Sequence, residues 1–100
     1  MENKLIKKVD EILDGLKNEI TYVTWFGDIK LYVYREDYFG NLPRRTKIKG
    51  LIKTENECWG CSIDISMVYL KTIEDFKRAM EFAINDVVRK LTNQRYGVML

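Results

Sequence analysis

The chain has 100 residues, of which 46% are hydrophobic and 12% aromatic, which is enough apolar material for one folded domain over residues 1–100. This composition excludes a disordered linker or a fibre, and a formal net charge of +2 is too small to support an argument about acidic partners from the charge of the whole molecule. The chain contains no histidine, so the usual general base and the commonest metal ligand are both missing.

The first predicted element is a helix over residues 4–17. Its apolar residues recur at spacings of three and four, which places them in one stripe with charged residues outside it. The stripe consists of Leu5, Ile6, Val9, Ile12, Leu13 and Leu16. We therefore expect this helix to pack one side against a core.

Two hairpins are predicted after this helix. Residues 20–26 and 29–35 are rich in β-branched and aromatic side chains, and the Gly-Asp pair between them suits a two-residue turn that sets Trp25 opposite Lys30. A polar loop is expected over residues 36–43. Residues 46–53 and 58–68 then form the second hairpin, whose longer turn fixes the register less firmly.

A second helix is predicted to begin after Thr72, which suits an N-cap, with Asp75 in the place of the capping-box acid. The apolar stripe of this helix consists of Ile73, Phe76, Met80, Ala83, Ile84, Val87, Val88 and Leu91. Residues 96–100 are predicted to be either a short added strand or a flap over the core.

The order of helix, four strands and helix predicts an α+β fold. A helix is about 10 Å wide and strands lie about 4.8 Å apart, so two helices cover four strands on one face only. We expect a two-layer sandwich in which the N- and C-terminal helices lie on one face of a four-stranded antiparallel sheet made of two hairpins.

The two faces of this sheet differ in composition. Strand alternation assigns to the covered face Ile20, Tyr22, Phe26, Ile29, Leu31, Val33, Ile48, Ile52, Ile63, Ile65 and Met67. It assigns to the open face Val23, Trp25, Lys30, Tyr32, Tyr34, Lys47, Lys49, Leu51, Lys53 and Asp64. An uncovered face with rings and lysines is typical of a binding surface. Two alternatives to a binding surface remain. The rings are ordinary strand residues that pack against one another, or the face is buried in a homodimer.

A basic segment precedes and enters the third strand. It carries five positive charges and no acid, at Arg44, Arg45, Lys47, Lys49 and Lys53. One interpretation is that these cations bind the phosphates of a nucleic acid while its bases stack on the neighbouring rings of Trp25, Tyr32 and Tyr34. The other interpretation is that they are solvated and protect the sheet from edge-to-edge aggregation, with Lys47 partly neutralised by Asp64 across the strands.

Cys58 and Cys61 form a C-x-x-C pattern on a predicted strand, where residues three apart face opposite sides. Redox pairs of this spacing usually lie at a helix N-terminus, and a zinc site needs two more ligands, which only a symmetric dimer would supply. We expect reduced thiols in or near the core. No pairing of nucleophile with base and no phosphate-binding loop is found, so we expect neither an enzyme nor a bound cofactor or metal.

The sequence therefore predicts a small, cytoplasmic, non-enzymatic protein that binds a larger protein or nucleoprotein and makes no membrane contact. The expected partner-binding residues are Trp25, Lys30, Tyr32, Tyr34, Arg44, Arg45, Lys47, Lys49 and Lys53. A regulator, or a phage- or virus-encoded inhibitor of host machinery such as a defence nuclease, fits this description. The alternative function is a nucleic-acid-binding domain that uses the same face.

Overall fold

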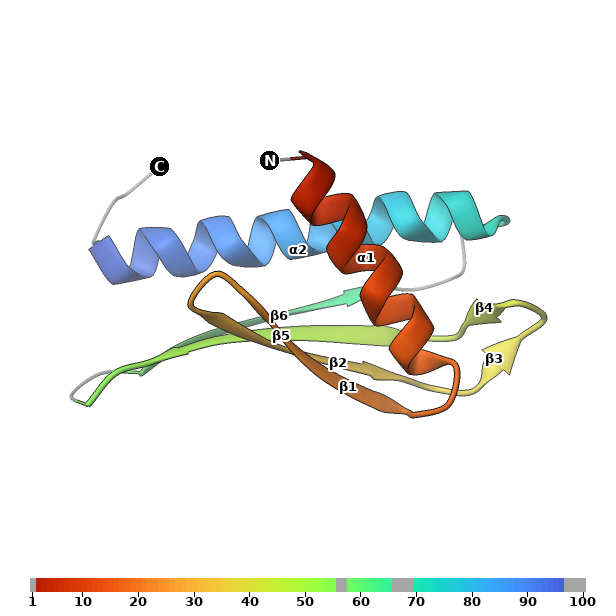
Figure 1. Cartoon of the computed structure of the whole chain (residues 1–100), viewed down its shortest axis with the longest axis horizontal. Coiled ribbons are helices and arrows are strands. Elements are labelled where there is room, and N and C mark those ends of the chain that lie inside the picture. The colour runs from red at the N-terminus through yellow and green to blue at the C-terminus, as the bar shows by residue number, and fades with distance from the viewer. Residues whose placement is uncertain (1, 56–57, 66–69, 97–100) are drawn as a thin grey trace.

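The structure, a computed structural model, describes residues 2–55, 58–65 and 70–96. Its elements are α1 (Glu2–Leu16), β1 (Thr21–Phe26), β2 (Ile29–Arg35), β3 (Tyr38–Phe39), β4 (Leu42–Pro43), β5 (Thr46–Lys53), β6 (Cys58–Ile65) and α2 (Ile73–Tyr96). The four longer strands form an antiparallel sheet in the order β1-β2-β5-β6. Both helices lie on one side of it (Figure 1). The predicted α+β arrangement is confirmed.

The first hairpin has the predicted register. Phe26 pairs with Ile29 and Trp25 with Lys30. Gly27 has a φ of 64°, the left-handed conformation that a two-residue turn requires and that glycine adopts without strain. The turn therefore fixes which β1 and β2 side chains share a face.

The second hairpin also has the favoured register, with Lys47 opposite Asp64. At its centre, α2 lies directly on the backbone of β5. A Cβ atom added at Gly50 would be 2.8 Å from Leu91 Cδ1 and closer still to Val87 Cγ1. Only glycine leaves room for this approach of helix to strand.

The core lies between the helices and the covered face. The fully buried side chains include Phe76, Met80 and Ile84 of α2, packed with Leu31 and Ile48 of the sheet. Burying a side chain of this size stabilises the fold by roughly 1.5–3 kcal/mol. This layer therefore anchors the strands that carry the open face.

The N-terminus of α2 follows the sequence prediction. The backbone amide of Asp75 donates to Thr72 Oγ1 at 3.1 Å, and that of Phe76 donates to the Thr72 carbonyl oxygen at 3.1 Å. Tyr96, predicted to begin the tail, is the last residue of α2. Met67 and residues 97–100 lie outside the described residues, so the predictions made for them stay untested.

The predictions for Ile20 and for residues 36–43 are wrong. Ile20 was assigned to the covered face, but its side chain is 55% exposed, because it lies in the bend that links α1 to β1 and strand alternation does not reach it. Residues 36–43 are not only a polar loop. They contain the β3–β4 hairpin, in which Gly40 has a φ of 66° and Leu42 and Pro43 are buried.

Candidate functional site

The open face of the sheet arranges its side chains in three cross-strand rows. Because directly paired residues point to the same side, each row runs across β1, β2, β5 and β6. The rows are Trp25-Lys30-Leu51-Gly60, Val23-Tyr32-Lys49-Ser62 and Thr21-Tyr34-Lys47-Asp64. The register thus brings together six of the predicted site residues, with Leu51 and Val23 as apolar neighbours.

Lys30 joins two of the rings on this face. Its Nζ lies 5.7 Å from the ring centroid of Trp25 and 5.2 Å from that of Tyr32. At these distances the ammonium group is attracted to both ring faces. The side chain of Trp25 remains 56% exposed and that of Tyr34 45%. The face therefore presents broad aromatic surface whose central cation is already held in place.

A depression of about 290 Å³ adjoins this cluster. Its lining is formed by Tyr32, Tyr34, Lys47, Lys49 and Leu51. Two rings and one aliphatic side chain give it an apolar part, and two ammonium groups stand beside them. It suits an apolar side chain of a partner with an acidic neighbour.

The remaining predicted site residues lie at the ends of the face. Arg44 and Arg45 are exposed before the first residue of β5, and Arg45 Nη1 lies 3.9 Å from Glu36 Oε1. Lys53 lies at the other end of β5, paired with Cys58. The structure does not bring these three cations into the rows. They form the margins of the candidate surface.

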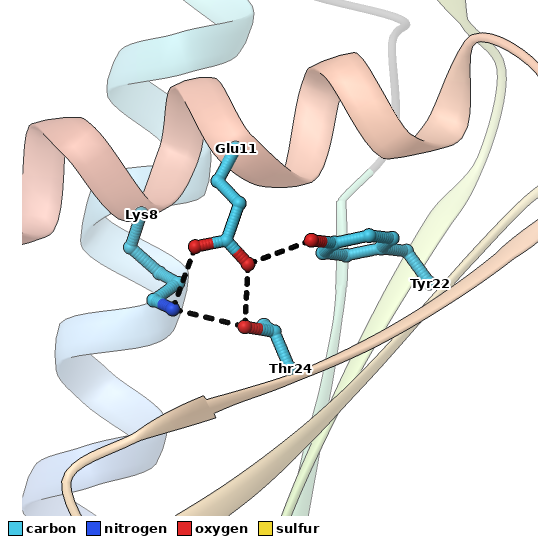
Figure 2. Close-up of polar contacts among 4 residues, drawn as sticks. All are labelled: Lys8, Glu11, Tyr22 and Thr24. Atoms are coloured by element: carbon cyan, nitrogen blue, oxygen red, sulfur yellow. Dashed lines mark hydrogen bonds and ion pairs between the residues drawn. The ribbon is translucent and has the colours of Figure 1, made fainter.

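A polar cluster on the covered face ties β1 to α1 (Figure 2). Glu11 accepts hydrogen bonds from Thr24 Oγ1 at 2.6 Å and from the Tyr22 hydroxyl at 2.7 Å. Lys8 Nζ donates to Glu11 Oε1 and to Thr24 Oγ1, both at 2.9 Å. Tyr22 and Thr24 alternate with Val23 and Trp25 of the open face, so this cluster sets the position of the strand that carries the tryptophan.

The hydrogen bonds of this cluster shift the pKa values of Glu11 and Tyr22. The hydrogen bond from Thr24, followed by that from Lys8, lowers the pKa of Glu11 from 4.5 to about 2. The hydrogen bond that Tyr22 donates to Glu11 raises the pKa of the Tyr22 hydroxyl. Sequence reasoning missed the cluster, although a polar residue at a covered strand position, Thr24, was a signal that a partner on the helix was needed.

Arg35 is a buried cation that the sequence reasoning did not single out. Its Nε donates to the carbonyl oxygen of Leu16 at 2.6 Å, and its Nη1 donates to that of Glu36 at 3.3 Å. Its guanidinium carbon lies 4.5 Å from the ring centroid of Tyr38. A cation suits the last carbonyl groups of a helix, so Arg35 fixes the end of α1 against β2 and the β3–β4 hairpin.

The two cysteines point to opposite faces, as predicted from their spacing. Cys58 is exposed, Cys61 is half-buried on the covered face, and both are free thiols. The prediction that both thiols lie in or near the core is therefore wrong for Cys58, because it pairs with Lys53 on the side of the sheet that faces away from the helices. Within the described ranges, no group of three or more His, Cys, Asp or Glu residues is close enough together to hold a metal ion. The absence of a bound metal or cofactor stays a prediction.

No protein-family model matches the chain. Neither the curated proteins nor the solved structures give a significant match. Among the described helices, none combines the length and the apolar character that crossing a membrane requires.

Proposed function

We propose that this protein is a small non-enzymatic binding domain that docks its open sheet face onto another protein. The observation that carries the proposal is the uncovered aromatic surface around Trp25, Tyr32 and Tyr34, with Lys30 held against two of the rings. Contiguous apolar surface of this kind is uncommon on monomers, and tryptophan and tyrosine contribute most to binding energy where they become buried.

The charges of the face favour a partner with an acidic surface. The three rows contain three lysines and one acid, Asp64, and further cations stand at both ends of β5. Opposite charges at the rim of an interface guide the encounter of two proteins. We therefore expect the partner to present an apolar patch bordered by Asp or Glu side chains.

A protein partner is favoured over nucleic acid because several of the cations have local partners. Lys30 lies against two rings, Lys47 is opposite Asp64, and Arg45 is paired with Glu36. Binding to nucleic acid is driven mainly by cations that neutralise phosphates, and the net charge of the chain is only +2. The lack of histidine supports a binding role rather than acid–base catalysis. The biological role proposed is that of a cytoplasmic regulator or inhibitor.

The proposal is tested by capturing a partner from a lysate with the immobilised chain and then titrating the purified partner in solution. The test variant is Trp25→Ala, and the matched control is Ile6→Ala, which removes an exposed apolar side chain from α1. Losing an interface tryptophan costs about 2 kcal/mol, so Trp25→Ala is expected to weaken binding about 30-fold. The control is expected to bind within about twofold of the wild type.

Two results would contradict the proposal. One is unchanged partner affinity for a folded Trp25→Ala variant. The other is submicromolar binding of the wild type to a labelled single strand or duplex at about 150 mM salt, which would assign the face to nucleic acid instead.

A further inference from the structure

β6 is an edge strand of the sheet, and its outer side carries little protection against pairing. Among residues 2–55, 58–65 and 70–96, which the structure describes, the sheet order β1-β2-β5-β6 leaves one side of β6 without a neighbouring strand. Its eight residues include no lysine, arginine or proline, and Asp64 is its one charged residue. Proteins usually protect such edges with lysine, proline or a covering segment, because an exposed edge pairs readily with another strand.

The covered side of β6 is also incompletely buried. Trp59, Cys61 and Ile63 are only half-buried there, and Ile65 alone is buried. Above this edge, Phe82 of α2 is 70% exposed. A groove of about 620 Å³ runs between β6 and α2, and its lining includes Ile63, Asp64, Phe82, Asp86 and Arg89. At this edge, therefore, both the sheet and the helix layer leave apolar side chains partly exposed.

We infer that β6 pairs antiparallel with β6 of a second copy of this chain, which joins two sheets into one of eight strands. A twofold axis makes such an edge complementary to itself, since each strand offers the same amide and carbonyl groups to the other. The pairing uses the outer edge of β6, and the groove beside that edge shares only Asp64 with the rows of the open face. It does not depend on the function proposed for that face.

The spacing of the helix layer agrees with this pairing. α2 packs on β6 and β5, so each copy brings a helix that covers two strands (Figure 1). Two strands occupy about 10 Å, which is also the distance at which neighbouring helices pack. The α2 helices of the two copies would then lie side by side, with Phe82 of each between them.

Charge distinguishes this edge from the other one. Beside β1, a hollow is lined by Lys4, Lys7 and Lys8 of α1 and by Glu11, which pairs with Lys8, so Lys4 and Lys7 would face the same lysines of a second copy. The β6 groove instead contains Asp64, together with Asp86 and Arg89, which pair with each other, so its charges are nearly balanced and a second copy meets little like-charge repulsion there. An edge about 26 Å long and two layers thick buries on the order of 1,000 Å² in total, which predicts a weak, reversible dimer.

The experiment is sedimentation equilibrium under reducing conditions, with Phe82→Glu as the test variant. The matched control is Ile6→Glu, which adds the same charge at an exposed apolar position of α1. The wild type and the control are expected to be largely dimeric at about 100 µM and monomeric near 1 µM, while Phe82→Glu weakens the dimer at least ~10-fold. A monomeric wild type at about 500 µM, or a Phe82→Glu variant as dimeric as the wild type, would overturn the inference.

Amide hydrogen exchange of the wild type gives a second measurement that needs no variant. Dimer formation is expected to slow exchange in β6 and to leave β1 unchanged. Protection of β1 but not β6, or a dimer that Trp25→Ala abolishes, would assign self-association to another surface and refute the pairing through β6.

Discussion

Gly50 and Gly60 lie on neighbouring strands and face opposite sides of the sheet, so the same substitution at each tests which face the helices cover. At Gly50 an added methyl group meets Leu91 at 2.8 Å and Val87 more closely. At Gly60 the nearest atom is Leu51 Cδ1 at 3.6 Å, an ordinary contact. Alanine is therefore overpacked at the first position and fits at the second.

The magnitudes follow from these contacts. Overpacking costs about 1–3 kcal/mol, and replacing glycine by alanine returns about 0.4–1 kcal/mol through the unfolded state. Gly50→Ala is thus expected to destabilise the fold by about 1–2 kcal/mol, and Gly60→Ala to be neutral or slightly stabilising. Since about 1 kcal/mol shifts Tm by 4–8 °C in a domain of this size, the two variants should differ by roughly 4–16 °C.

The assay is thermal unfolding followed by far-ultraviolet circular dichroism, with urea unfolding as a check on the free energies. The reasoning would be refuted if Gly60→Ala lost as much stability as Gly50→Ala. It would be refuted equally if Gly50→Ala melted at the wild-type temperature. The first result would mean that the open face is covered at Gly60, and the second that α2 does not lie against the backbone of β5.

Three further predictions concern charged groups. Because the fold lowers the pKa of Glu11 from 4.5 to about 2, the ionised carboxylate stabilises the folded state above pH 4.5, and this contribution is lost as the pH falls toward 2. With a discount for a side chain that is 41% exposed, the contribution is about 1 kcal/mol. Glu11→Gln should therefore reduce the change in the free energy of unfolding, measured with urea, between about pH 4.5 and pH 2. Arg35→Met should cost about 2–3 kcal/mol in urea unfolding, because it leaves the Leu16 carbonyl group without its charged donor. Exchanging Lys49 and Lys53 for glutamine should slow association with the partner severalfold in stopped-flow measurements and leave dissociation nearly unchanged.

Much of the fold follows from local rules that the sequence displays. A two-residue turn with glycine at position 27 leaves one register for the first hairpin, and Thr72 has the spacing of an N-cap. Once the register is fixed, strand alternation alone places Trp25 and Tyr32 on one face. The membership of the candidate site was predictable for this reason.

Features that depend on how separate elements meet were not predictable. The bond between Glu11 and Thr24 depends on the angle at which α1 crosses β1, which periodicity does not specify. Arg35 looked like an ordinary strand residue, and its burial depends on where α1 ends. The position of Lys30 over two rings is likewise a side-chain conformation that no spacing encodes.

The most direct test of the proposed binding face uses the two tryptophans of the chain as internal reporters. Trp25 is on the open face, and Trp59, paired with Ile52, is on the covered face. In a two-dimensional NMR titration with the captured partner, the indole resonance of Trp25 should shift or broaden while that of Trp59 stays in place. A shift of Trp59 with Trp25 unchanged would contradict docking through the open face.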